Sequence, residues 1–333
     1  MRADRIVLDR RPRGVPVPGD FRWESRDLPT VAPGQVQLET LYLSVDPYMR
    51  GRMSERESYA APYALGDVIA GSVLARVVAT RSAQRAEGDL VLASYGWQTA
   101  SVVDAADTRA LPAGADPPVR ALSVLGSTGL TAYLGMGAVG RPGAGETVVV
   151  SGAAGAVGLV AGQVARIQGA RAVGITGSAA KCEVLTRQAR YASAVNYRMD
   201  DFAEQLRAAC PHGVDVYFDN VGGAVSDAVL SLINQGARIV VCGQISQYHV
   251  DSPVNRVPIP TVLLNHGALM QGFMVMRYAD RYEEARRDLR AWLASGELWY
   301  RETILDGFER TVDAFLQLFT GGNLGKMLVR VAG

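Results

Sequence analysis

The chain has 333 residues, a formal net charge of +1 and 48% hydrophobic residues. This length predicts about two domains, with enough core to fold without disulfides or metal. No basic run indicates nucleic-acid binding, no apolar stretch is long enough to span a membrane, and the N-terminus lacks the apolar segment of a signal peptide. The three cysteines are too few and too scattered for a disulfide framework, so the reducing cytoplasm is the expected compartment.

The first 120 residues or so predict a β-rich domain. Residues 35–45, "QVQLETLYLSV", contain an alternating stretch, and residues 69–79 and 89–96 are short β-branched runs. Glycine, proline and aspartate bound these runs, as is usual for strands. We expect a compact domain of the β-barrel type.

Strands and helices then alternate, which predicts βαβ units and a parallel, doubly wound sheet of the Rossmann type. After "RAWLASGELWYRE" the alternation stops, and a helix, a turn and a terminal strand are expected to return to the first domain. The predicted domains are therefore 1–122 with 299–333, which would hold the substrate, and 123–298. The candidate strands of the second domain are 147–151, 172–176, 194–196, 214–218, 237–241 and 270–275.

A glycine-rich turn follows the first of these strands. Gly152, Gly155 and Gly158 have the spacing G-x-x-G-x-x-G, and "VVV" precedes them. A tight turn between a strand and a helix brings backbone N–H groups and the positive end of the helix dipole close to a pyrophosphate. We interpret the turn as a dinucleotide site rather than as a packing feature.

The second strand ends in "GITGSAAK", residues 174–181, where an NAD-binding unit usually carries an acidic residue. Thr176, Gly177 and Ser178 are small and neutral, and Lys181 adds a positive charge. Such a pocket favours the 2'-phosphate of NADP(H). Tyr197 is a further candidate hydrogen-bond donor, and a solvated helix lysine remains the alternative for Lys181.

Metal ligands are scarce in the sequence. The first cysteine is Cys182 and the first histidine is His212, so the N-terminal domain contains neither residue type. Catalytic zinc needs cysteine, histidine or acidic ligands held close together. We therefore predict that the protein uses no metal.

Seven motifs keep one order along nearly the whole chain. They are "LSVDPYMRGRM" (43–53), "GLTAYLG" (129–135), "SGAAGAVG" (151–158), "VNYR" (195–198), "VYFDNVGG" (216–223), "CGQISQY" (242–248) and "GGNLGK" (321–326). On these motifs the chain resembles the zinc-independent branch of the medium-chain dehydrogenase/reductase superfamily, in particular the leukotriene B4 12-hydroxydehydrogenase/prostaglandin reductases, alkenal double-bond reductases and curcumin reductases. The resemblance implies a GroES-like domain beside the Rossmann domain. The stretch 246–260 departs from the family pattern.

The resemblance also implies roles for particular residues. Tyr48, Arg50 and Tyr248 would bind substrate, and Tyr248 would be the catalytic hydrogen-bond donor, unless it is only a packing aromatic. The NADP(H) contacts implied by the resemblance, together with those already inferred from the sequence, are Gly152, Ala153, Ala154, Gly155, Ala156, Val157, Gly158, Thr176, Gly177, Ser178, Lys181, Tyr197, Asn220, Cys242, Gly243, Ile245, Ser246, Tyr248, Phe273, Met274, Val275 and Asn323.

The family's chemistry is conjugate reduction, in which hydride from NADPH attacks the β-carbon of an α,β-unsaturated aldehyde or ketone. Quinone reduction is the enzymatic alternative, and a non-catalytic NADPH-binding protein is a further one. The apolar stretch "LMQGFMVM" is expected to pair with a second copy and form a homodimer, unless a loop covers that edge.

Overall fold

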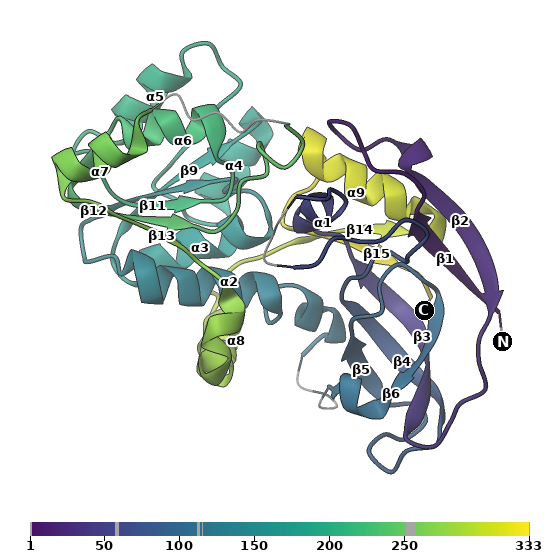
Figure 1. Cartoon of the computed structure of the whole chain (residues 1–333). Coiled ribbons are helices and arrows are strands. Elements are labelled where there is room, and N and C mark those ends of the chain that lie inside the picture. The colour runs from purple at the N-terminus through teal and green to yellow at the C-terminus, as the bar shows by residue number, and fades with distance from the viewer. Residues whose placement is uncertain (1, 57–59, 112–113, 115, 251–256, 333) are drawn as a thin grey trace. The chain divides into compact units, whose positions relative to one another are not determined.

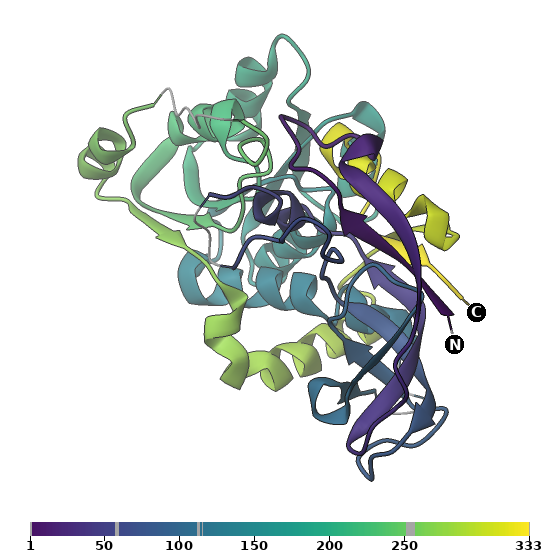
Figure 2. The same ribbon diagram turned by 45° about the vertical axis from the view of Figure 1, so that its right-hand side comes forward.

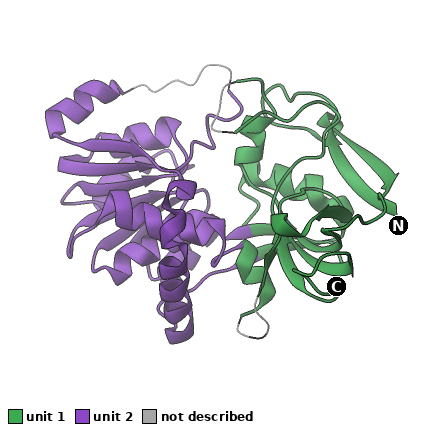
Figure 3. Cartoon of the chain, turned by 60° about the horizontal axis from the view of Figure 1, so that its bottom comes forward, with its two compact units in different colours: residues 1–122, 303–323, 327–333 green, residues 123–302, 324–326 purple. Residues whose placement is uncertain are grey.

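The computed structural model describes residues 2–56, 60–111, 114, 116–250 and 257–332. The chain forms two compact units, which Figure 3 distinguishes by colour. Unit 1 comprises Met1–Leu122, Thr303–Asn323 and Met327–Gly333, and unit 2 comprises Ser123–Glu302 and Leu324–Lys326. The chain therefore passes between the units four times, and the three tail residues 324–326 belong to unit 2.

Unit 2 is built around a parallel sheet that has six strands among the described residues. The strand order is β10-β9-β8-β11-β12-β13, which is the order of a doubly wound dinucleotide-binding sheet. Its strands are β8 (Thr147–Ser151), β9 (Arg171–Thr176), β10 (Ser193–Asn196), β11 (Val214–Asp219), β12 (Ile233–Val241) and β13 (Leu269–Gly272). Each lies where the sequence predicts a strand.

Helices cover both faces of this sheet (Figure 1). Both faces of the sheet are apolar, as successive residues of β8 show. Val148 and Val150 belong to the core under α2, α3 and α8, and Val149 belongs to the core under α5, α6 and α7. The helices of unit 2 are α2 (Ser127–Gly135), α3 (Ala156–Ile167), α4 (Ala179–Arg187), α5 (Phe202–Ala209), α6 (Gly223–Leu230), α7 (Ile259–His266) and α8 (Tyr282–Ser295).

The last strand of the sheet is shorter than the sequence predicts. The prediction of a strand over 270–275 is wrong in its last three residues, because β13 ends at Gly272. The backbone N–H of Phe273 still donates to Val241 O (2.9 Å), but the ring turns inward and stacks on Tyr278 with 5.1 Å between ring centroids. A 3-10 helix then begins at Val275, so the chain leaves the sheet.

Unit 1 is mainly antiparallel. Its larger sheet has the order β14-β15-β3-β4-β5-β7, β6 also pairs with β3, and β1 and β2 form a separate pair. The elements are β1 (Arg2–Leu8), β2 (Phe21–Asp27), β3 (Gln35–Ser44), α1 (Tyr48–Arg52), β4 (Val73–Thr80), β5 (Leu90–Ala93), β6 (Ala100–Asp104), β7 (Arg109–Ala110), β14 (Glu302–Asp306), α9 (Thr311–Thr320) and β15 (Lys326–Arg330).

The core of unit 1 is formed by side chains of the larger sheet, of the β1–β2 pair and of α9, and this pair and α9 are neighbours in both Figure 1 and Figure 2. Phe21 packs edge-on against Phe315 of α9, with 6.1 Å between ring centroids, and Trp97 completes this aromatic group. The C-terminal strand β15 pairs with β3, so the tail is joined to the N-terminal part of the chain by a backbone ladder. Among the described residues, no helix is long and apolar enough to cross a membrane.

Candidate active site

The glycine turn joins β8 to α3. Gly152 has a φ of +59°, a conformation that favours glycine, and its carbonyl accepts from the N–H of Gly155 at 2.9 Å. A Cβ on Gly158 would lie 2.4 Å from Gly152 O, so only glycine allows this close approach. Gly155 is the N-cap of α3 and has no side chain with which to cap it. The first turn of α3 therefore offers N–H groups and a positive dipole end to an anion.

A second group of predicted residues gathers where β9 ends. Thr176 is buried, and the N–H of Tyr197 donates to its carbonyl at 3.0 Å. A Cβ on Gly177 would lie 3.1 Å from the Tyr197 ring, which explains the small residue at this position. Ser178 is the N-cap of α4, where its Oγ accepts from the N–H of Lys181 at 3.3 Å. The structure thus brings the predicted 2'-phosphate residues of "GITGSAAK" and "VNYR" together.

Arg198 belongs to the same group, although the sequence analysis did not select it. Its Nε would lie 3.4 Å from a Cβ on Gly177, and its guanidinium lies 5.7 Å from the centroid of the Tyr197 ring. Burial lowers the pKa of Lys181, and the positive charge of Arg198 lowers it further. The two positive charges therefore repel each other unless an anion lies between them. Arg198 directly follows Tyr197 in the motif "VNYR", so its place in that motif could have identified it.

The carboxyl ends of β8 and β11 meet where the strand order reverses, which is where doubly wound sheets bind their ligands. Asn220 donates from Nδ2 to Ser151 O (2.8 Å) and from its backbone N–H to Ser151 Oγ (2.9 Å). Ser151 Oγ in turn donates to Asp219 Oδ1 at 2.9 Å. Asn220, a predicted cofactor residue, is therefore rigidly placed beside the glycine turn.

Asp219 is a buried acid that sequence reasoning did not assign. Besides Ser151 it accepts hydrogen bonds from the hydroxyls of Tyr217 (2.8 Å) and Ser226 (2.6 Å), and from the N–H groups of Val221 and Gly222. These donors compensate a carboxylate that is only 4% exposed. Asp219 therefore organises the end of β11 and the loop after it.

The loop 242–248 follows β12 and lies against this network. The N–H groups of Cys242 and Gly243 donate to Asp219 O at 2.9 and 3.0 Å. Further along, Ile245 donates to Asn220 O and Ser246 to Val221 O. Burial, aided by the charge of Asp219, raises the pKa of Cys242 to about 12, so this thiol stays protonated at neutral pH.

Tyr248 ends this loop and folds back onto it. Its hydroxyl oxygen accepts from the N–H of Gln244 at 3.3 Å, and burial raises its pKa. The phenol therefore keeps its proton at neutral pH and can donate it to an acceptor. Its predicted contact with substrate stays a prediction, and residues 251–256 of the stretch that departs from the family pattern lie outside the described residues.

Three tail residues, Leu324–Lys326, belong to unit 2, and Gly325 among them contacts the glycine turn. We call these three residues the tail clamp. The N–H of Gly325 donates to Ala154 O at 2.8 Å, and Gly325 also forms a parallel bridge with Gly155. Gly325 has a φ of +68°, and a Cβ there would lie 1.7 Å from Arg301 O. Asn323, predicted to contact the cofactor, directly precedes the clamp.

Unit 1 carries the other two predicted substrate residues on α1. Tyr48 is half-buried at the start of the helix. Arg50 is only 5% exposed, and its guanidinium donates to Pro12 O and Gly14 O. The structure thus gives Arg50 a role in holding the loop 12–14, and its contact with substrate stays a prediction.

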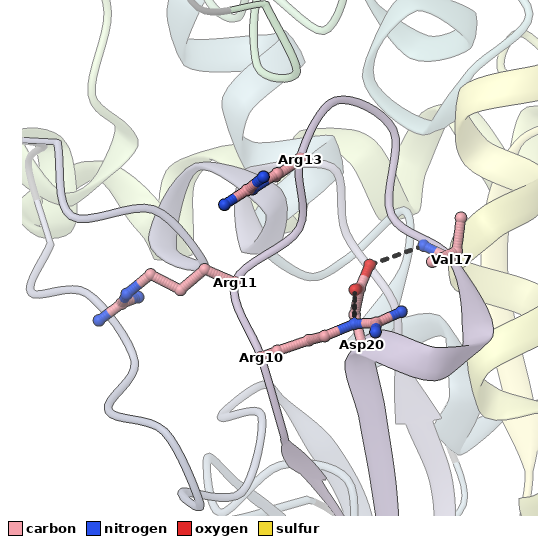
Figure 4. Close-up of a pocket in the computed structure, with 5 residues that line it drawn as sticks. All are labelled: Arg10, Arg11, Arg13, Val17 and Asp20. Carbon is pink, nitrogen blue, oxygen red and sulfur yellow. Dashed lines mark hydrogen bonds and ion pairs between the residues drawn. The ribbon is translucent and has the colours of Figure 1, made fainter.

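A pocket that sequence reasoning missed lies in unit 1, with a volume of about 460 Å³. Figure 4 shows its lining residues, which are Arg10, Arg11, Arg13, Val17 and Asp20. They belong to a proline- and glycine-rich loop whose irregular sequence has no period from which a site could be predicted.

Two family models match the chain. The model described as the N-terminal domain of oxidoreductase covers residues 4–111, and the one described as zinc-binding dehydrogenase covers residues 156–291. Despite the second description, residues 1–181 contain no cysteine or histidine. Within the described ranges, no group of three or more histidine, cysteine, aspartate or glutamate side chains could hold a metal ion.

Individual relatives match over the whole length. The protein YfmJ of Bacillus subtilis is 48% identical over 331 residues, which are 98% of this chain and 97% of that protein. NADPH-dependent curcumin reductase of Escherichia coli is 42% identical over 337 residues, covering 100% of this chain and 98% of the enzyme. CurA of Vibrio vulnificus, solved in complex with NADPH, is 40% identical with a TM-score of 0.95, and 99% of each chain is covered.

These matches confirm the predicted family, the predicted fold class and the prediction that the chain is an oxidoreductase. The predicted cofactor, NADP(H), agrees with the ligand in the CurA crystal structure.

Proposed function

The chain belongs to the zinc-independent branch of the medium-chain dehydrogenase/reductase superfamily, and from this premise we propose that it is an NADPH-dependent reductase of the carbon–carbon double bond of α,β-unsaturated aldehydes and ketones. The support for the reaction is the 42% identity to a curcumin reductase over the whole chain. The support for the cofactor is a feature of this chain, the presence of two cations, Lys181 and Arg198, near the position where NAD-binding units carry an acid.

The donor set fits NADPH. The glycine turn and the uncapped first turn of α3 would hold the pyrophosphate. Lys181, Arg198, Tyr197 and the Ser178 hydroxyl would hold the 2'-phosphate, since they offer two positive charges and two hydroxyl donors. Asn220, the loop 242–248 and residues 273–275 would contact the ribose and nicotinamide.

When bound, NADPH supplies the hydride that a double-bond reduction needs. The chain's own residues then have to orient the enone and stabilise the negative charge that develops on its carbonyl oxygen. Tyr248 is our candidate for the second task, because its phenolic O–H lies at the end of the loop 242–248, which is bonded to Asn220 O and Val221 O beside the glycine turn. Tyr48 would position the substrate.

A rate measurement tests this proposal. NADPH oxidation is followed at 340 nm with an enone such as 3-nonen-2-one and, separately, with a benzoquinone. The proposal requires turnover of the enone that depends on added enone. Turnover of the quinone with none of the enone would assign the chain to the alternative, a quinone reductase, and NADPH binding without turnover of either would indicate a non-catalytic protein.

We also propose a homodimer that forms through β13, the edge strand of the sheet in unit 2. Among the described strands β13 pairs only with β12, which leaves its other side open. Leu264, Leu269 and Met276 on or beside this edge are 81%, 43% and 59% exposed, which is unusual for large apolar side chains that remain in contact with water. Light scattering should give twice the chain mass of 35.5 kDa, and a monomer would refute the proposal.

A further inference from the structure

Tyr191 is a buried phenol to which the proposed function assigns no role. It lies in the turn between α4 and β10 and is only 3% exposed. Its hydroxyl accepts a hydrogen bond from the N–H of Gly162 at 3.1 Å and donates one to Gly158 O. Burial raises the pKa of Tyr191, so the hydroxyl keeps its proton and can donate it. Both hydrogen-bond partners of the hydroxyl are therefore backbone groups of α3.

These two backbone groups are the ends of one helical turn. In an α-helix the carbonyl of one residue and the N–H of the residue four places later face each other. Gly158 is the third residue of α3, so its own N–H is one of the donors that the uncapped first turn offers to an anion. Tyr191 thus bonds to the turn that would hold the pyrophosphate.

This part of α3 needs support from outside the helix. Gly158 and Gly162 both lie in its first two turns, and glycine weakens a helix because it loses more conformational freedom than other residues. Neither glycine can gain a side chain without a clash. A Cβ on Gly158 would lie 2.4 Å from Gly152 O, and a Cβ on Gly162 would lie 2.0 Å from Cζ of Tyr191. The close approach of the glycine turn and the packing of the phenol therefore both require a helix of low intrinsic stability.

The phenol itself is held from the opposite side by β9 and the end of α4. A Cβ on Gly174 of β9 would lie 3.1 Å from Cδ1 of the Tyr191 ring. The N–H of Tyr191 donates to Leu185 O of α4 at 3.0 Å. Arg190, directly before Tyr191, has a φ of +55°, a left-handed conformation that is uncommon for residues with a side chain. All of these contacts lie within unit 2.

We propose that Tyr191 is a positioning residue for NADPH, whose hydroxyl holds the first turn of α3 in the conformation that binds the pyrophosphate. The inference rests on the cofactor site of the proposed function and deepens it. Tyr191 acts through Gly158 and Gly162 and lowers the entropy cost of binding, because donors that are already ordered need no ordering by the ligand. The pyrophosphate is common to NADPH and NADH, so the hydroxyl should matter equally for both cofactors.

Binding of three ligands, measured without substrate, separates this role from that of Lys181. Calorimetry gives the dissociation constant of NADPH, and displacement of NADPH gives those of NADH and 2'-AMP, which has the 2'-phosphate but no pyrophosphate. Tyr191→Phe should weaken NADPH and NADH by the same factor, about three- to tenfold for one lost hydrogen bond, and leave 2'-AMP unchanged. Lys181→Ala should weaken NADPH and 2'-AMP and leave NADH unchanged.

Tyr63→Phe is the matched control. Tyr63 is a buried residue of unit 1 whose hydroxyl also accepts one hydrogen bond, from Arg52 Nη1 at 3.4 Å, and donates one, to Ala70 O at 2.8 Å. Its loss should leave all three dissociation constants unchanged, and thermal melting of both variants separates a loss of stability from a loss of binding. Gly162→Ala should reproduce the binding pattern of Tyr191→Phe, because its Cβ would displace the phenol.

Three results for Tyr191→Phe would overturn the inference. They are unchanged binding of all ligands, equal weakening of all three, and weakening confined to NADPH and 2'-AMP. None of them bears on double-bond reduction, which the rate measurement with an enone tests separately. Wild-type protein that binds neither NADPH nor NADH would refute the proposed function and the inference together.

Discussion

Replacing Lys181 by alanine should weaken the binding of NADPH and leave that of NADH unchanged. Lys181 is half-buried, and a hydrogen bond to a charged partner at such a site contributes about 1.5–3 kcal/mol. That range corresponds to a rise in KM for NADPH of about 12- to 160-fold. Arg198 is exposed, so Arg198→Ala should contribute about 1 kcal/mol or less, a rise of up to about fivefold.

Both cations act on one phosphate in this account, so their effects should be coupled. Burial lowers the pKa of Lys181, and the charge of Arg198 lowers it further, which means that the two side chains repel each other when no anion lies between them. The cost of the double variant should therefore differ from the sum of the two single costs.

The assay measures KM and kcat for NADPH and NADH with one enone in wild type, both single variants and the double variant. Arg187→Ala is the matched control, since Arg187 is an exposed arginine on α4 whose ion pair with Glu183 lies on its own helix. KM for NADPH should be unchanged in the control. An equal loss of NADPH and NADH binding in Lys181→Ala would refute the 2'-phosphate role.

Three further predictions concern the charge of Lys181, the tail clamp and Tyr248. Because the pKa of Lys181 is lowered, its charge is lost at a lower pH than for an ordinary lysine, so KM for NADPH should rise on the alkaline side, and Lys181→Arg should flatten that rise. Gly325→Ala should raise KM for NADPH more than it lowers kcat, because its Cβ would lie 1.7 Å from Arg301 O. Gly137→Ala is the control, because a Cβ at Gly137 would have open space around it, and this variant should leave KM for NADPH unchanged. Equal kinetics for the two variants would refute the tail clamp as a positioning element. Tyr248→Phe should lower kcat more than it changes KM, because the hydrogen bond strengthens only as charge develops, and wild-type rates would make Tyr248 a packing aromatic.

The strands of unit 2 were predictable from the sequence because β-branched runs such as "VVV" before Gly152 are both local and strongly patterned. The glycine turn was predictable for the same reason, since Gly152 and Gly158 are needed by backbone geometry within seven residues. The end of β13 was not predictable, because the ring of Phe273 finds its partner, Tyr278, in the segment after the strand.

The contributions that sequence reasoning missed depend on tertiary contacts. Arg198 joins the candidate 2'-phosphate residues because Tyr197, directly after β10, packs on Gly177, directly after β9. Gly325 donates a hydrogen bond to Ala154, which lies about half of the chain length away in sequence, so no local pattern could predict that contact. Arg50 was selected from its motif, but its burial and its bonds to the loop 12–14 required the fold.

Product analysis tests the central claim most directly. 3-Nonen-2-one is incubated with the enzyme and NADPH that is deuterated at C4 in the position that is transferred, and the product is examined by NMR. The account predicts 2-nonanone with the carbonyl intact and deuterium on the former β-carbon. An allylic alcohol that keeps its double bond, with deuterium on the carbinol carbon, would contradict double-bond reduction.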